Sequence, residues 1–310
     1  MSAARLRLRK NLTTLSFLAP ALIGIAVFFL YPLLSALYFS FTKFDLLAVP
    51  EWVGLDNYKR MADDPFLLQA VRNTLWMVVI FVPARIIGAI GLSMLLTQIR
   101  RGAGFFRTIF YLPALVPPVA ATIAFVYLLK PGIGPVNHVL EKIGIDGPLW
   151  FNSPTWAKPS LVLLGLWAIG DLMVIFLAAV LGVPESLYEA ASLDGANAWH
   201  RFKSITLPSI QPVILFAAVT GVIYTLQYFD QAAVAGSIAS GQATVGAGIS
   251  QSFGYPEGST FTYPLWLYTA GFRYSALGYA NALAIALFVV ALAVTVILLR
   301  RAKAFSGEQD

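Results

Sequence analysis

The 310-residue chain contains no cysteine and only two histidines, His138 and His200. The missing cysteines exclude disulfides, thiolate metal sites and cysteine nucleophiles, and they leave the redox compartment undetermined. Two isolated histidines without a neighbouring acid cluster do not make a metal site. Charged residues are also scarce, at 12% of the chain. The sequence therefore provides little for metal-dependent catalysis or for a fully solvated surface.

The chain also lacks the motifs of a nucleotide-hydrolysing or other enzyme. No GxxxxGK[ST] phosphate loop occurs, and no βαβ pattern surrounds any glycine-rich turn. Nor does a Ser/His set or an acid cluster gather near one face, as a membrane-embedded enzyme would need. We therefore expect no catalytic residues, no metal and no cofactor bound by this chain.

Hydrophobic residues, by contrast, make up 58% of the chain, and the mean hydropathy is +0.75. This exceeds what a soluble core needs. Apolar runs long enough to cross about 30 Å of hydrocarbon, about 20 residues each, occur at 15–41, 72–98, 108–129, 160–182, 210–234 and 279–299. The prediction is an all-α integral membrane protein with six transmembrane helices in one domain, residues 1–310.

The first run follows several basic residues, as a signal peptide would, but it has no small-residue cleavage site and is predicted to be a retained anchor. Basic residues flank the apolar runs rather than forming one stripe, so the net charge of +6 indicates membrane topology and not nucleic-acid binding. If six spans alternate, one side collects Arg5, Arg7, Arg9, Lys10, Arg100, Arg101, Arg107, Arg201, Lys203, Arg300, Arg301 and Lys303. By the positive-inside rule, both termini are then cytoplasmic.

The third run contains Pro113, Pro117 and Pro118, each of which removes a backbone donor. We expect a kinked bundle helix rather than a direct ligand contact. The segment between the fifth and sixth runs, residues 236–264, is rich in Gly and Ser and is predicted to be a flexible external loop.

A polar segment, 183–208, separates the fourth and fifth runs on the predicted cytoplasmic side. Pro184 suits the first turn of a helix, Gly195 suits a left-handed helix end, and the following residues can form a second short helix. The pattern predicts a helix, a turn and a helix. Composition alone leaves two interpretations open: a docking element for another protein, or an amphipathic loop resting on the lipid interface.

The same segment resembles the EAA loop of bacterial ABC importer permeases. The matching residues and their neighbours are Glu189, Ala190, Ala191, Asp194, Gly195, Phe202, Ile205, Leu207 and Pro208. Residues 53–76, 107–129 and 278–292 also resemble the sugar-uptake branch related to maltose and glycerol-3-phosphate permeases. Segment 236–264 departs from the Gly-Gly-Pro signature common in that branch.

The resemblance implies a type I importer permease in the bacterial plasma membrane. It implies two cytoplasmic ATP-binding cassette subunits that bind ATP and Mg²⁺, a second homologous permease, and an extracytoplasmic solute-binding protein. On this resemblance Glu189 contacts the ATPase and Gly195 holds the turn. The expected cargo is a sugar or sugar derivative; glycerol-3-phosphate or a glycerophosphodiester is the alternative, and a secondary transporter working without an ATPase is the alternative of another class.

Polar residues within the apolar runs are the remaining functional candidates, because they are costly in hydrocarbon. Three of them, Arg85, Asp171 and Asp230, are charged. Arg85 and Asp171 could form an internal ion pair, contact the partner permease or line a cavity. A structural pair or an interface is favoured. The resemblance places a solute site near mid-membrane on the fourth and fifth helices. There the expected site residues are Trp167, Thr220, Tyr224 and Gln227, against the alternative of a polar interface with the sister permease.

Overall fold

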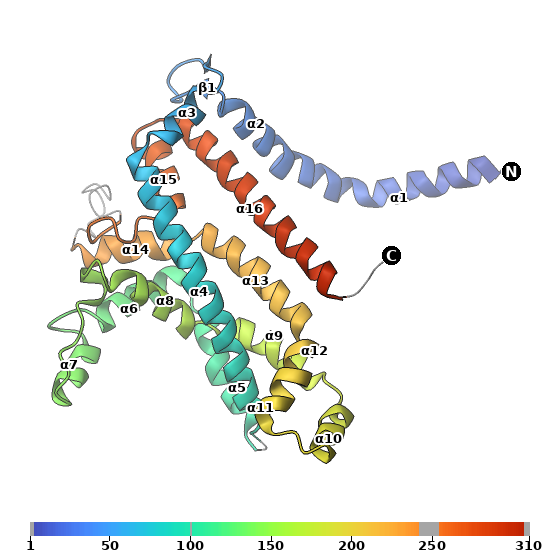
Figure 1. Ribbon diagram of the computed structural model, residues 1–310. Helices are drawn as coiled ribbons and strands as arrows, with labels where there is room; N and C mark the ends of the chain where they lie inside the picture. The colour runs from blue at the N-terminus through green and yellow to red at the C-terminus, as the bar shows by residue number, and fades with distance from the viewer. Residues whose placement is uncertain (1–2, 100, 242–253, 307–310) are drawn as a thin grey trace. The chain divides into compact units, whose positions relative to one another are not determined.

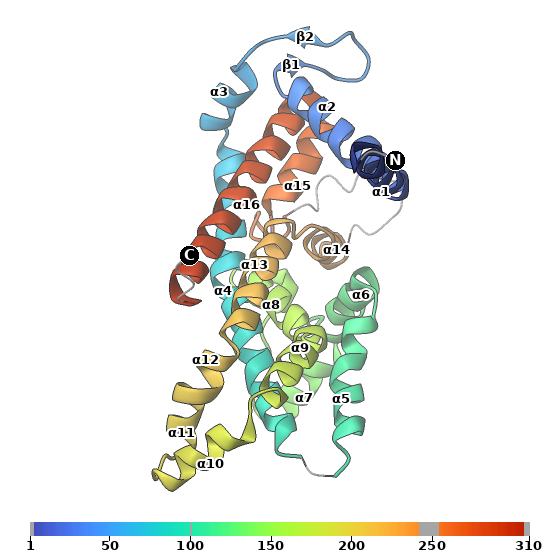
Figure 2. The same cartoon turned by 90° about the vertical axis from the view of Figure 1, so that its right-hand side faces the viewer.

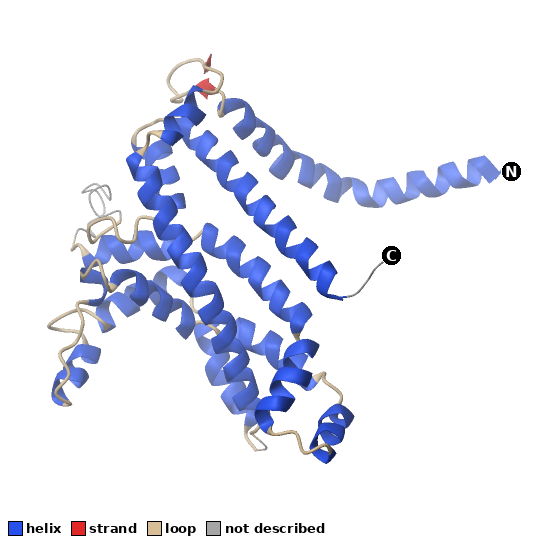
Figure 3. Cartoon of the chain, in the orientation of Figure 1, coloured by secondary structure: helices blue, strands red, loops and turns tan. Residues whose placement is uncertain are grey.

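A computed structural model describes residues 3–99, 101–241 and 254–306, and the side chains within 13–99, 101–241 and 254–300 (Figure 1). Arg100 and part of the predicted loop 236–264 therefore lie outside the described residues. The elements are α1 (Ala3–Ile25), α2 (Tyr31–Phe39), β1 (Thr42–Lys43), β2 (Glu51–Trp52), α3 (Asp56–Ala62), α4 (Pro65–Thr97), α5 (Ala103–Tyr111), α6 (Pro118–Leu128), α7 (Pro135–Lys142), α8 (Ala157–Trp167), α9 (Gly170–Leu181), α10 (Glu185–Leu193), α11 (Ala198–Arg201), α12 (Leu207–Ser209), α13 (Gln211–Leu226), α14 (Asp230–Ala239), α15 (Tyr263–Tyr268) and α16 (Leu277–Ser306). Apart from loops and turns, the described chain consists of helices and one two-stranded ribbon (Figure 3).

Residue contacts divide the chain into two compact units, 1–64 with 267–288, and 65–266 with 289–310. Of the three divisions, the one at 64/65 lies between α3 and α4, and the other two fall inside helices α15 and α16. Because two helices continue across two of these divisions, the two units are not separate domains. The single membrane domain stays a prediction.

In the first unit, α1 and α2 join through a π-helical turn at Ala26–Leu30. The stretch Thr13–Phe39 is long and apolar enough to span a bilayer, and its most apolar window has no residue buried within the chain. Lipid or another subunit must therefore cover it. Near the ribbon, the amide of Gly278 donates to the carbonyl of Phe44 at 3.1 Å, and the hydroxyl of Tyr279 donates to Asp64 at 2.5 Å.

In the second unit, the 33-residue helix α4 packs against α9 and α13. One buried cluster joins Met77 and Phe81 of α4 to Leu161 of α8 and Tyr228. A second cluster joins Ala89 and Ile90 of α4 to Phe176 of α9, to Ile210 and to Ala217 of α13. These clusters hold the middle and one end of α4 between its neighbours.

Three candidate spans are bent pairs of helices rather than straight helices. Residues Ala103–Leu115 and Pro118–Leu128 meet at 98°, Ala157–Trp167 and Gly170–Leu181 at 51°, and Ala198–Ser209 and Gln211–Leu226 at 66°. The first bend confirms the kink expected from the prolines, although Pro118 also lines the cavity described below. With three long helices and three bent pairs, up to six spans fit by length and composition among the described residues.

The fifth run differs from its expected bounds, 210–234. Helix α13 ends at Leu226, and a separate helix α14 begins at Asp230. At the break, the carbonyl of Tyr228 accepts a hydrogen bond of 2.9 Å from the Thr262 hydroxyl. A freed backbone carbonyl needs such an internal partner in a membrane protein, which explains how the helix can stop before the apolar run does.

Candidate solute cavity and coupling hairpin

Residues 183–208 form a helical hairpin, named here the coupling hairpin. Helix α10 ends in a left-handed glycine, Gly195, at φ +77°. The amide of Ala196 donates to the carbonyl of Ala191 at 2.9 Å, and that of Gly195 to the carbonyl of Ser192 at 3.1 Å. This is the Schellman pattern that satisfies the last carbonyls of a helix. The predicted helix and glycine turn are observed, although Pro184 is the N-cap of α10 and not its first helical residue.

The second arm of the hairpin begins where the Asn197 side chain accepts a hydrogen bond from the amide of His200 at 2.8 Å. Such a cap satisfies an otherwise unpaired donor of the first turn. The helical path continues through a π-helical turn at Phe202–Thr206 and through α12, past Pro208, and reaches α13 (Figure 2). The Tyr188 and Thr206 hydroxyls lie 2.9 Å apart and tie the two arms together.

Apolar side chains on the coupling hairpin are unusually exposed. Leu193 is 90% exposed and Trp199 is 69% exposed, and Leu187 is exposed beside them. Such anchors favour burial against a partner. Between the arms lies a hollow of about 430 Å³, lined by Ala191, Asp194, Gly195, Ala196, Asn197, His200, Arg201, Ser204 and Ile205.

The expected coupling residues occupy different places on this hairpin. Glu189 and Ala190 are exposed on α10, whereas Ala191, Asp194, Gly195 and Ile205 line the hollow. Phe202 instead packs against the cluster around Ile210; Leu207 is half-buried and Pro208 is exposed. The surface available to a partner therefore lies on α10 and in the hollow, and Phe202 belongs to the support beneath it.

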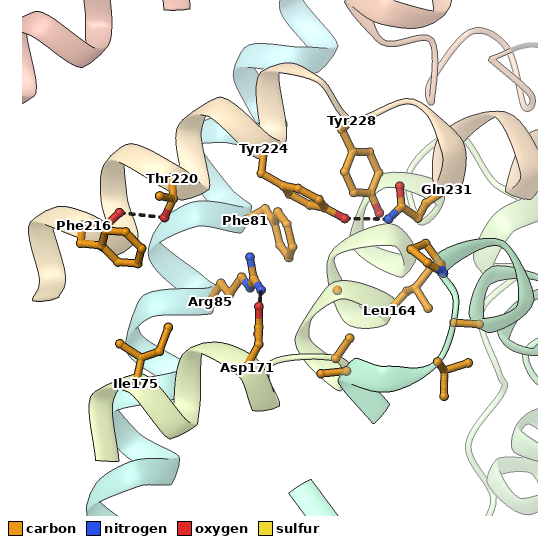
Figure 4. A pocket seen from close by; sticks show the side chains of 16 residues that line it. Phe81, Arg85, Leu164, Asp171, Ile175, Phe216, Thr220, Tyr224, Tyr228 and Gln231 are labelled. Carbon is orange, nitrogen blue, oxygen red and sulfur yellow. Dashed lines mark hydrogen bonds and ion pairs between the residues drawn. The ribbon is translucent and has the colours of Figure 1, made fainter. Parts of the chain in front are cut away.

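A second hollow, named here the central cavity, has a volume of about 510 Å³. It is lined by residues of α4, α6, α8, α9, α13 and α14 and of the turn before α6: Phe81, Arg85, Ala114, Val116, Pro118, Ala121, Leu164, Gly165, Ala168, Asp171, Ile175, Phe216, Thr220, Tyr224, Tyr228 and Gln231 (Figure 4). Mostly apolar walls with a few polar groups are typical of small-molecule sites of this size.

An ion pair forms part of the wall of the central cavity. Arg85 Nη2 of α4 lies 2.8 Å from Oδ1 and 2.6 Å from Oδ2 of Asp171, which stands in the first turn of α9. The Arg85 guanidinium also lies 5.8 Å from the ring centre of Tyr224. The ion pair and the cavity wall, which are alternatives on the sequence alone, are thus one arrangement in the structure.

Beside the ion pair, polar groups from α13 and α14 face the cavity. Gln231 Nε2 donates to the Tyr224 hydroxyl at 2.7 Å, and the Thr220 hydroxyl donates to the Phe216 carbonyl at 2.7 Å (Figure 4). The hydroxyl of Tyr228, a residue only 3% exposed, has no hydrogen-bond partner among the described residues. Buried polar atoms are rarely left unpaired without a functional or solvent explanation.

Of the four solute-site residues expected from sequence, Thr220 and Tyr224 line the central cavity, and Gln227 and Trp167 do not. Gln227 is the C-cap of α13, so the expected helical spacing from Tyr224 ends there. Trp167 lines a separate apolar groove of about 440 Å³ with Phe125.

The positions of Asp230, Tyr228 and Gln231 differ from what the sequence indicated or left open. Asp230 is exposed at the start of α14 and does not line the cavity. Tyr228 and Gln231, which do line it, were missed as site residues, since no Gly or Pro at 227–230 signals the break that turns them inward. Among the described residues, no three His, Cys, Asp or Glu side chains gather closely enough to hold a metal ion.

Known proteins similar to this chain are membrane transport subunits. The family described as binding-protein-dependent transport system inner membrane component matches residues 87–304. The probable ABC transporter permease protein YesP of Bacillus subtilis (strain 168) is 34% identical, over 97% of this chain and 93% of YesP. The lactose transport system permease protein LacF of Rhizobium radiobacter is 36% identical, over 83% of each. A bacterial ABC transporter involved in the import of the acidic polysaccharide alginate has a similar fold, with a TM-score of 0.81, 22% identity, and coverage of 98% and 99%.

Proposed function

This chain belongs to the binding-protein-dependent transport system inner membrane components, and from this membership we propose that it moves a sugar or sugar derivative through the central cavity of an ATP-driven importer. The family is one of membrane transport subunits, so the predicted multi-pass permease, and not an enzyme, is confirmed. An external solute-binding protein delivers the solute, and a second permease completes the path.

The observation that carries the proposal is the coupling hairpin, with its capped helices, exposed Leu193 and Trp199, and a hollow between its arms. An exposed apolar rim around a polar hollow suits a folded protein partner better than water. The proposed partner is one of two ATP-binding cassette subunits, which bind ATP and Mg²⁺ while this chain binds no cofactor. Glu189, exposed on α10, is positioned to meet a basic or hydrogen-bonding group of that subunit.

A continuous structural path links the hairpin to the cavity. Helical residues run from Ala198 to Ser209, and after a 66° bend α13 carries Thr220 and Tyr224 into the cavity wall. Ile210, at the bend, is fully buried against α4 and α9. Because packed interiors transmit displacement instead of absorbing it, movement of the hairpin by the ATPase would shift this cavity wall.

The side chains that line the central cavity also indicate which solute it can bind. The hydroxyl of Tyr224 and the amide of Gln231 can bond sugar hydroxyls, and Phe81 and Tyr224 offer ring faces to sugar C–H groups. LacF, by its name, transports lactose. Arg85 is the feature that favours the alternative cargo, glycerol-3-phosphate or a glycerophosphodiester, because a guanidinium pairs well with phosphate.

The proposal is tested by purifying the chain, expressed with its neighbouring genes, and assaying the complex in proteoliposomes. We expect an ATP-binding cassette subunit to co-purify, and sugar uptake to require both ATP and the binding protein. Leu193→Asp, which places a charge at the exposed rim, should release the ATPase. Ile143→Asp, at an exposed position outside the hairpin and the candidate spans, is the control and should leave assembly intact. Uptake by the chain alone without ATP would identify a secondary transporter and refute the proposal.

A further inference from the structure

The charges that line the central cavity cancel. Among the described lining residues, Arg85 is the one cation and Asp171 the one anion. Their closest nitrogen–oxygen distance is 2.6 Å, and the same Nη2 reaches both carboxylate oxygens. The cation that would attract an anionic solute is therefore already paired through Nη2, while its Nε is buried without a hydrogen-bond partner among the described residues.

The helix end beside the cavity also has this carboxylate next to it. Asp171 lies in the first turn of α9, where the positive end of the helix dipole favours a carboxylate. The guanidinium and this helix terminus therefore both stabilise the ionised form of Asp171. An anion entering the cavity would meet Asp171, whose side chain is 52% exposed, without a free positive group to offset it.

An uncharged hydrogen-bonding group remains available beside the ion pair. The Tyr224 hydroxyl accepts a hydrogen bond from Gln231 but keeps its own proton to donate, and a solute hydroxyl can accept it. A carboxylate or phosphate would accept this proton too but would also bring an uncompensated charge into an enclosed site.

We propose that Asp171 is a specificity-determining residue that makes the cavity select neutral polyhydroxylated solutes over anionic ones by cancelling Arg85. This inference rests on the proposed function and decides between its two cargo classes. Asp171 acts through Arg85, so the affinity of the cavity for an anion should follow the net charge of the pair.

The test uses the assembled complex in nanodiscs without the binding protein, which would otherwise impose its own selectivity. The probes are methyl glycosides of glucose and galactose, their matching uronides, and glycerol-3-phosphate, measured by equilibrium binding. Asp171→Asn makes the pair cationic, Arg85→Gln makes it anionic, and the double variant is neutral like the wild type. The neutral double variant also guards against misfolding caused by an unpaired buried charge.

We expect the wild type to bind the glycosides at least about tenfold more tightly than the uronides, and Asp171→Asn to raise uronide affinity by about tenfold, the scale of one nearby charge in a partly screened site. The double variant should behave as the wild type, and Arg85→Gln should bind uronides least. Tyr224→Phe should weaken glycoside binding about threefold to tenfold, as one lost hydrogen bond does.

Tighter binding of uronides or glycerol-3-phosphate by the wild type would overturn the proposal, as would an order of uronide affinities unrelated to the pair's charge. Saturable binding of no probe by the assembled complex would overturn it too. A different result would refute the proposed function itself: the absence of any ATPase subunit from the purified complex.

Discussion

The hydroxyl of Thr262 donates a hydrogen bond of 2.9 Å to the carbonyl oxygen of Tyr228, across 34 residues of sequence. Tyr228 stands where α13 stops, and its side chain lines the central cavity. The bond satisfies a carbonyl that the helix break would otherwise leave unpaired in a buried setting. It therefore helps to fix the direction in which the cavity-lining residues of α14 leave the break.

Replacing Thr262 with Val removes this donor at nearly constant volume. Because the carbonyl of Tyr228 stays buried, we expect the free energy of unfolding to fall by about 1–3 kcal/mol, seen as a lower thermal midpoint in detergent. Thr262→Ser keeps the hydroxyl and should retain most of the stability. Equal losses in both variants would mean that the methyl group, and not the hydrogen bond, holds the break.

Gly170 provides a sharper packing test. A Cβ at this position would overlap the carbonyl oxygen of Phe110 and the Cα of Tyr111, both backbone atoms that cannot rotate away. Overpacking of this kind costs about 1–3 kcal/mol, so Gly170→Ala should lower the thermal midpoint. Gly91→Ala in α4 is the matched control, because nothing lies within 4 Å of its added Cβ. That control should be neutral or slightly stabilising, and the same loss in both variants would contradict the close approach.

These residues show how far the sequence could predict the molecule. The lengths of the apolar runs located the membrane helices, because crossing the hydrocarbon takes about 20 apolar residues. The turn at Gly195 was predictable too, because a left-handed backbone conformation favours glycine. Gln231 and Tyr228 could not be placed in the same way. Their inward direction depends on the end of α13, which carries no Gly or Pro and is completed by Thr262 from a distant segment.

The cytoplasmic position of the coupling hairpin is a prediction that this cysteine-free chain makes simple to check. Leu193→Cys and Ile143→Cys place single thiols at exposed sites in the coupling hairpin and just after α7. A membrane-impermeant maleimide should label Ile143→Cys on intact cells and Leu193→Cys only after lysis. The unsubstituted chain is the background control, and labelling of Leu193→Cys on intact cells would reverse the assigned topology.

The turn of the coupling hairpin should control energy transfer more than folding. At φ +77°, Gly195 can be replaced by Asn, which tolerates left-handed backbone, whereas Val is strained there by about 1–2 kcal/mol. The strain would be confined to the coupling hairpin, because α10 has no buried residue. The rest of the chain should therefore remain folded. We expect Gly195→Val to lose ATP-driven uptake and ATPase co-purification, and Gly195→Asn to retain both.

Glu189→Lys tests the same surface by charge instead of backbone geometry. Glu189 is exposed on α10, and no hydrogen bond or ion pair within the described chain is assigned to it, so its reversal should not unfold the hairpin. If it meets a basic group of the ATPase, the lysine repels that group, and both co-purification and uptake should fall while the thermal midpoint of the isolated chain is unchanged. Asp146→Lys, at an exposed position after α7 and outside the coupling hairpin, is the control for the same change of charge. Normal assembly and uptake in Glu189→Lys would remove Glu189 from the contact and leave the hollow between the arms as the remaining docking surface.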